Sequence, residues 1–226
     1  MLQDVTNQYI ATLLSRCDLG GKFVLEIGCG KGRITRDLAK HARHVAATDP
    51  DAAAVATALA TIAADNVTIM HTPGGMPEFP AGSFDLVIYT LSLHHIPIAE
   101  MSGSLHLAAR LLRNAGVIVV VEPGEGGSFT EAKERFGAGS GDERPAREAA
   151  IRAMHALTGW SVAETLHFRT LFRFDDDEDF FSNMLADYRS RPEPIVDEVR
   201  AFLQRHRTGS GIILDAERRL NVLRRL

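Results

Sequence analysis

Short apolar runs alternate with helix-favouring stretches along the first half of the chain. Five runs rich in aliphatic residues are predicted to be buried strands, at residues 23–27, 44–48, 67–70, 84–90 and 117–122. The stretches around them favour helices, at residues 4–17, 33–41, 51–64 and 101–112. Strands that alternate with helices are joined by right-handed crossovers. This half of the chain therefore predicts a mainly parallel sheet with helices on both faces.

The second half of the chain has a different pattern. Residues 124–141 contain six glycines among charged residues, which predicts a flexible segment that is either a functional lid or a plain surface linker. Next come a helix, a strand whose apolar and polar residues alternate, and a last strand, at residues 144–157, 160–174 and 212–226. Five acidic residues at 175–179 favour a helix N-terminus, and so a helical insertion is predicted at residues 176–206.

These elements together predict one α/β domain over residues 1–226, with a leading helix within residues 1–18. The fold class is Rossmann-like and doubly wound. Its sheet should be mainly parallel and seven-stranded, with helices on both faces and an antiparallel last strand.

Composition excludes several classes of protein. No apolar run approaches the roughly 20 residues that a membrane-spanning helix needs. The net charge is -4 and the basic residues are scattered, which argues against a nucleic-acid partner. The first residues lack the basic and apolar regions of a secretory signal, and a cytoplasmic location is expected. Neither the two cysteines nor His41, His44 and His71 have metal-ligand spacing, and we expect no metal.

The most informative stretch is EIGCGKG at residues 26–32, which follows the first strand. Glycines directly after a buried strand let the chain turn sharply and let a ligand approach the backbone. A helix follows, as in nucleotide-binding strand-loop-helix units. A dinucleotide fingerprint, G-x-G-x-x-G, would place its third glycine at position 33, which is Arg33. The E-x-G-x-G-x-G form instead resembles the first motif of the class I S-adenosylmethionine-dependent methyltransferases.

The resemblance covers about residues 20–125, the predicted cofactor-binding half. It implies that S-adenosylmethionine contacts Glu26, Gly28, Cys29, Gly30, Gly32, Asp49, Pro50, Gly74, Leu91 and Ser92. Asp49 ends the second strand, where a carboxylate can accept hydrogen bonds from both ribose hydroxyls; its alternative role is a helix cap. Glu26 either binds the methionine amino group through water or braces the glycine loop. Many relatives have an adenine-binding Asp where this chain has Pro73, so backbone groups near residues 74–76 are expected to replace it.

TLSLHHI at residues 90–96 is similar to a segment of the quinone-biosynthesis and small-molecule methyltransferases. The resemblance implies that His94 or His95 is a catalytic base or positioning group at the carboxyl end of the sheet. The alternative for each is a buried, hydrogen-bonded histidine. Three more side chains are candidates for substrate contact, with capping or core packing as their alternatives: Tyr9, Glu122 and Tyr188.

The expected function is methyl transfer from S-adenosylmethionine to a small-molecule acceptor by in-line displacement. Alignment of the reacting atoms can supply most of the rate, so a catalytic base is not required by the chemistry. Two alternatives stay open. An NAD(P)-dependent oxidoreductase would share the fold and Asp49, although the glycine spacing argues against it. A regulatory protein could bind the nucleoside without transferring methyl.

Overall fold

The structure is a computed structural model that describes residues 1–226. The chain divides into two compact units. The larger unit comprises Ile10–Glu122, Ala146–Leu166 and Arg219–Leu226. The smaller unit comprises Met1–Tyr9, Pro123–Pro145 and His167–Arg218.

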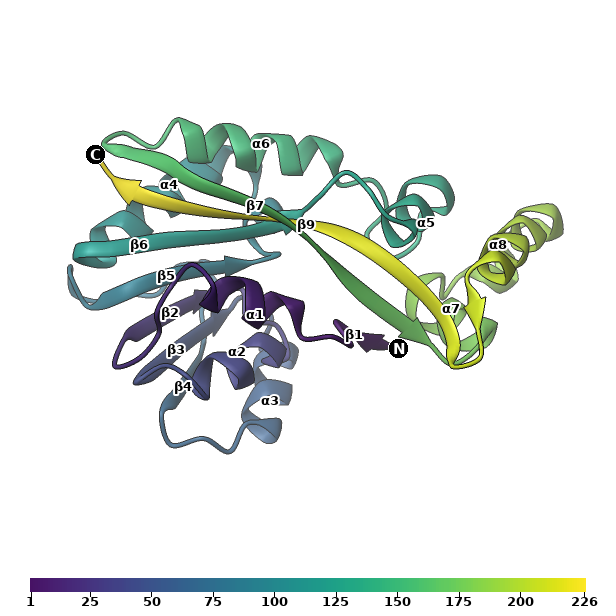
Figure 1. The fold of residues 1–226 in the computed structure, drawn as a ribbon, viewed down its shortest axis with the longest axis horizontal. Coiled ribbons are helices and arrows are strands. Elements are labelled where there is room, and N and C mark those ends of the chain that lie inside the picture. The colour runs from purple at the N-terminus through teal and green to yellow at the C-terminus, as the bar shows by residue number, and fades with distance from the viewer. The chain divides into compact units, whose positions relative to one another are not determined.

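The larger unit contains the five predicted apolar strands (Figure 1). They are β2 (Phe23–Ile27), β3 (His44–Asp49), β4 (Val67–His71), β5 (Phe84–Thr90) and β6 (Leu112–Pro123). Their order in the sheet is β4-β3-β2-β5-β6, and each neighbouring pair is parallel. The predicted parallel sheet is therefore confirmed. All five strands end at the same edge, where ligands bind in such folds.

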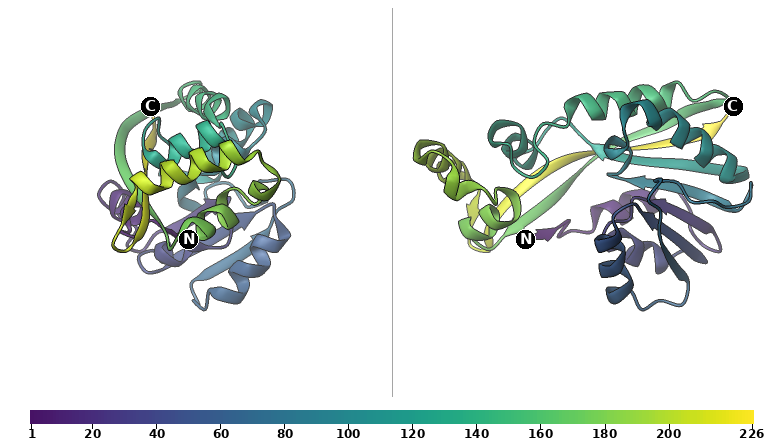
Figure 2. Two further views of the ribbon diagram at one scale, coloured as in Figure 1. Left: turned by 90° about the vertical axis from the view of Figure 1, so that its right-hand side faces the viewer. Right: turned by 180° about the vertical axis from the view of Figure 1, so that it is seen from behind.

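Helices cover both faces of this sheet (Figures 1 and 2). One face packs against α4 (Ile98–Leu111) and α6 (Arg144–His155), whose apolar side chains join one core with those of β2, β5 and β6. The other face carries α2 (Arg33–Ala39) and α3 (Ala52–Thr61). Because strand side chains alternate between faces, Leu25 belongs to the first core while its neighbour Glu26 bonds to α2.

The complete sheet has nine strands, in the order β1-β7-β9-β6-β5-β2-β3-β4, with β8 paired to β9. The last strand, β9 (Gly211–Arg225), is antiparallel to β6, as predicted (Figure 1). The predicted number, seven, is too low by two strands, β1 (Leu2–Gln3) and β8 (Arg207–Thr208). Each has only two residues, too few to show an alternating pattern.

The smaller unit has an apolar cluster of its own. Parts of β7 (Trp160–Phe174) and β9 contribute to it, with α5 (Ser128–Phe136), α7 (Asp177–Met184) and α8 (Glu193–Arg205). Helix α5 lies inside the segment 124–141 that the composition predicts to be flexible. Glycines flank α5 at both ends, and one of its buried side chains, Phe129, stacks on Phe172 with ring centroids 3.9 Å apart. The apolar face of α5 explains why this glycine-rich stretch contains a helix.

Two helices begin three or more residues away from their predicted starts. The leading helix, α1 (Gln8–Leu14), is shorter than residues 4–17 because the Asp4 carboxylate accepts the backbone N–H groups of Gln8 and Tyr9, at 2.8 and 3.0 Å. Helix α4 begins at Ile98 rather than residue 101. None of the helices combines the length and apolar character needed to cross a bilayer.

Candidate functional site

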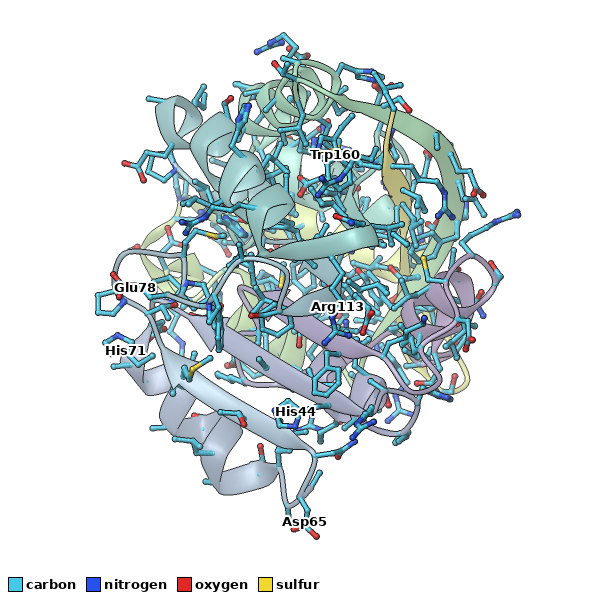
Figure 3. All side chains as sticks on the ribbon, turned by 90° about the vertical axis from the view of Figure 1, so that its left-hand side faces the viewer. His44, Asp65, His71, Glu78, Arg113 and Trp160 are labelled. Carbon is cyan, nitrogen blue, oxygen red and sulfur yellow. The ribbon has the colours of Figure 1, made fainter.

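A cavity of about 1240 Å³ in the larger unit lies at the carboxyl edge of the parallel strands. The ends of β2 and β3 and the loops after β2, β4 and β5 contribute to its lining, and α4 completes it. Arg113 and His44 mark the opposite, amino edge in Figure 3, where a smaller pocket of about 500 Å³ lies beside Arg113. The Arg113 guanidinium lies 5.0 Å from the centroid of the Phe23 ring and donates a hydrogen bond of 2.8 Å to Asp85. The carboxyl edge is therefore the candidate site.

The three glycines of the loop after β2 have different roles. Gly30 has a φ of +54°, and a Cβ placed on it would meet no atom within 4 Å, so bare backbone faces the cavity. A Cβ on Gly28 would lie 2.3 Å from Ser92 Cβ, so this glycine permits close approach of the loop after β5. A Cβ on Gly32 would lie 2.4 Å from Ile62 Cδ1. Gly32 is therefore needed for packing, and it does not line the cavity.

Asp49 holds the glycine loop and faces the cavity at the same time. Its Oδ2 accepts the Gly30 N–H at 2.7 Å, and its Oδ1 accepts the Asp51 N–H at 2.9 Å. Each carboxylate oxygen can accept a second hydrogen bond, so both can still receive ligand hydroxyls. The helix-cap role, the alternative for Asp49, belongs to Asp51, whose side chain accepts the N–H groups at the start of α3. Pro50, between them, also lines the cavity.

Glu26 and Cys29 are predicted cofactor contacts that do not line the cavity. Glu26 is 1 % exposed and accepts the Thr35 hydroxyl at 2.6 Å, so it braces α2 against β2. Burial disfavours its charged form and raises its pKa to about 7. Burial likewise raises the pKa of the Cys29 thiol to about 12, which keeps it protonated and unreactive.

The raised pKa of Glu26 predicts a pH-dependent stability. The folded protein keeps a proton that the unfolded chain releases, so this stabilisation is complete below about pH 4.5 and is lost as the pH rises through 7. The loss should be about 3 kcal/mol, at about 1.4 kcal/mol for each pKa unit. Urea unfolding of Glu26→Gln should show a flatter pH profile between these limits. Glu78→Gln, at an exposed position (Figure 3), should keep the parent slope; equal slopes for parent and Glu26→Gln would contradict the prediction.

The loop after β5 reaches the cavity through Leu91 and Ser92, as predicted. The Ser92 hydroxyl donates to the Ile27 carbonyl at 2.5 Å and ties this loop to the end of β2. Leu91 has a φ of +57°, a left-handed conformation that is strained for a leucine. Such strain is commonly found at functional sites.

The two histidines of this loop occupy different environments. His95 is exposed and lines the cavity, whereas His94 is buried. His94 Nδ1 lies 2.7 Å from Glu122 Oε2, and neither side chain is more than 2 % exposed. The ring centroids of the two histidines are 4.1 Å apart. Glu122, a predicted substrate contact, thus binds His94 in the interior, and its Oε1 has no hydrogen-bond partner.

The two tyrosines proposed for substrate contact belong to the smaller unit, within which both make contacts. Tyr9 is 4 % exposed and meets the edge of Phe168, with ring centroids 5.6 Å apart. Tyr188 stacks on Phe181 at 4.4 Å, and its hydroxyl donates to Glu178 at 2.8 Å. These contacts are the packing interactions that the alternative role of both tyrosines predicts.

Sequence reasoning missed the wall that α4 contributes to the cavity. Five residues of this helix line it: Ala99, Glu100, Gly103, Ser104 and Leu107. Met76, from the loop after β4, joins this wall because the Ser104 hydroxyl lies 3.3 Å from its sulfur. Gly74, a predicted contact, lines the cavity beside it. The spacing of 99, 103 and 107 marks one helix face, but no sequence pattern shows that this face borders a cavity.

Bare backbone at Gly30, a hydroxyl-binding carboxylate at Asp49 and a cavity at the carboxyl edge fit a nucleoside ligand. The fold is thus Rossmann-like, the class of fold that binds nucleotides at this edge of the sheet. Residues 24–116 match the family model described as Methyltransferase domain. This part of the chain is therefore similar to a methyltransferase domain.

Two relatives in sequence are named as methyltransferases, and a solved structure shares the fold. An uncharacterized methyltransferase of Mycobacterium tuberculosis is 31% identical over 113 residues, which are 50% of this chain and 56% of that protein. Another, from Geobacillus kaustophilus, is 28% identical over 157 residues, which are 69% of this chain and 66% of that protein. The chain thus spans about half the length of the Mycobacterium relative. A candidate methyltransferase from Bacillus halodurans shares the fold with a TM-score of 0.62 at 18% identity, covering 95% of this chain and 97% of its own.

Proposed function

We propose that this chain transfers a methyl group from S-adenosylmethionine to a small-molecule acceptor in the cytoplasm. The observation that carries the proposal is the open backbone at Gly30 beside the Asp49 carboxylate. S-adenosylmethionine supplies a methyl group on a positively charged sulfur, which a nucleophile can displace. Asp49 would bind its ribose hydroxyls, and the loop 91–92 would border its methionine chain.

The size and lining of the cavity favour a small acceptor. A typical ligand pocket measures about 300–1,000 Å³, so a cavity of about 1240 Å³ leaves room beside the nucleoside. Apolar side chains at Ile96, Pro97 and Leu107 would exclude water from part of it. The net charge of -4 argues against nucleic acid as the acceptor.

His95 is the base candidate that faces the cavity. An imidazole nitrogen of His95 could accept the proton of a hydroxyl or phenol acceptor as the new bond to carbon forms. His94, which binds Glu122 in the interior, would then be a positioning group for His95 through their ring contact.

Replacement of His95 by alanine should lower turnover by about 100-fold or more if the acceptor loses a proton, because one general base contributes about 10²–10⁴-fold. The affinity for S-adenosylhomocysteine should change less than threefold, since the glycine loop and Asp49 stay intact. Steady-state kinetics with calorimetric binding of S-adenosylhomocysteine measures both quantities. Unchanged turnover in His95→Ala would remove His95 from the reaction.

A binding experiment tests the proposal itself. S-adenosylhomocysteine and NADH are titrated separately into the protein by calorimetry, and we expect binding of the first only. Binding of NADH alone would favour the oxidoreductase. A panel of hydroxyl, amine and thiol acceptors is then offered with labelled S-adenosylmethionine. Tight S-adenosylhomocysteine binding without methyl transfer to any acceptor would favour the regulatory alternative.

A further inference from the structure

The face of helix α4 that borders the cavity has a glycine at its centre. Ala99, Gly103 and Leu107 follow one another at intervals of four residues and all line it. Gly103 lies in the interior of α4, where glycine is less favourable than alanine because it gives up more backbone freedom. A Cβ placed on Gly103 would meet no atom within 4 Å. No contact within the protein therefore requires glycine here, and the vacant volume belongs to the cavity.

The position of Gly103 along the cavity follows from its neighbour Ser104. The Ser104 hydroxyl lies 3.3 Å from the Met76 sulfur and 2.8 Å from the Tyr89 hydroxyl. These contacts join α4 to the loop 73–76 after β4, the neighbour of β3 in the sheet. Asp49 ends β3. A ribose held by Asp49 would direct its directly attached base toward the loop 73–76, and hence toward Gly103.

Glu100 supplies an unused acceptor on the same wall. It is one of three carboxylates that line the cavity, with Asp49 and Asp51. The side chains of those two already accept backbone N–H groups, whereas that of Glu100 has neither a hydrogen bond nor an ion pair within the chain. Glu100 precedes Ser104 by four residues and so lies on the same side of α4. Its carboxylate can accept only N–H or O–H donors, such as the amino group of adenine.

We propose that Gly103 and Glu100 form the adenine subsite of the cavity: the bare face at Gly103 receives the flat base, and the Glu100 carboxylate accepts its amino group. The inference rests on the proposed function. It also answers how adenine is recognised in a chain with Pro73, since the acceptor comes from α4 rather than from the loop 73–76.

Calorimetric titration of S-adenosylhomocysteine tests whether the base lies against Gly103. Gly103→Leu should weaken binding at least about 100-fold, because its side chain would occupy the space for the base. Gly103→Ala should raise the melting temperature yet weaken binding, a combination that a purely structural glycine would not give. The control is Ser102→Leu, an equally bulky change at an exposed neighbour that does not line the cavity, which should bind as the parent does.

Unchanged binding in Gly103→Leu would overturn the inference. So would a Gly103→Leu variant that binds S-adenosylhomocysteine normally but loses affinity for the acceptor, since Gly103 would then border the acceptor instead. If the parent itself failed to bind S-adenosylhomocysteine, the proposed function would fail, which is a separate result.

A pair of ligands tests Glu100. S-inosylhomocysteine carries a carbonyl oxygen where adenine has its amino group, and a carboxylate should disfavour it. The parent should prefer S-adenosylhomocysteine by about tenfold or more. Glu100→Gln should lose most of that preference, because an amide can donate to the carbonyl oxygen as well as accept from an amino group. A preference kept in full by Glu100→Gln would contradict the assignment.

Discussion

Replacing Gly30 with valine should abolish measurable uptake of S-adenosylhomocysteine, with a dissociation constant at least about 100-fold higher, or about 3 kcal/mol of binding free energy. Gly30 faces the cavity with a positive φ of 54°, and its N–H is held by Asp49. A branched side chain would fill the space that the ligand needs. It would also strain the loop, because a β-branched residue is an outlier at this φ. Isothermal titration calorimetry measures the loss.

The chain offers a matched control at Gly21. This glycine has a φ of +70°, a Cβ on it would likewise meet no atom within 4 Å, and it does not line the cavity. Gly21→Val imposes a similar backbone strain and should therefore lower the melting temperature while binding S-adenosylhomocysteine normally. Parent-like affinity in folded Gly30→Val, or equal losses in both variants, would show that the open backbone at Gly30 is not where the ligand lies.

Replacing His94 with leucine should lower the free energy of unfolding by about 3–5 kcal/mol, the usual cost of breaking a buried polar pair by removing one partner. Glu122 is 0 % exposed; its Oε2 accepts a hydrogen bond from His94 Nδ1, and its Oε1 has no hydrogen-bond partner. Without His94 its carboxylate would be buried with neither oxygen paired. Urea unfolding monitored by circular dichroism measures the change.

A double replacement separates the pair from the packing of His94. His94→Leu combined with Glu122→Leu removes the stranded carboxylate, and most of the stability should return. His106→Leu, an exposed position on α4, serves as the control and should change stability by about 0.5 kcal/mol or less. A double variant no more stable than His94→Leu would show that the buried carboxylate is not the source of the loss.

The parallel half of the fold was predictable because its signals are local. Strands β2 to β6 are continuous apolar runs, and the glycines after β2 mark a sharp turn before a helix. The same reasoning could not separate His94 from His95. Adjacent in sequence, they differ only in what surrounds them, and the partner of His94 lies 28 residues further along the chain.

The contribution of α4 to the cavity could not be predicted from the sequence, for a related reason. Gly103 within a helix indicates only a weak position, and Glu100 looks like an ordinary acidic residue in a first turn. Their place beside Met76 depends on packing between α4 and the loop after β4, which no local pattern encodes. Likewise, α5 was not predicted because residues 124–141 contain six glycines. These glycines flank the helix and do not interrupt it.

The two hydrogen bonds that Asp49 accepts from the backbone should affect the kinetics of ligand binding. Its two oxygens hold the N–H groups of Gly30 and Asp51 before any ligand arrives, so little chain has to be ordered during encounter. Association should then proceed in a single fast phase whose rate rises linearly with ligand concentration. A second, slow phase whose rate saturates with ligand concentration should appear only in variants that lack this carboxylate.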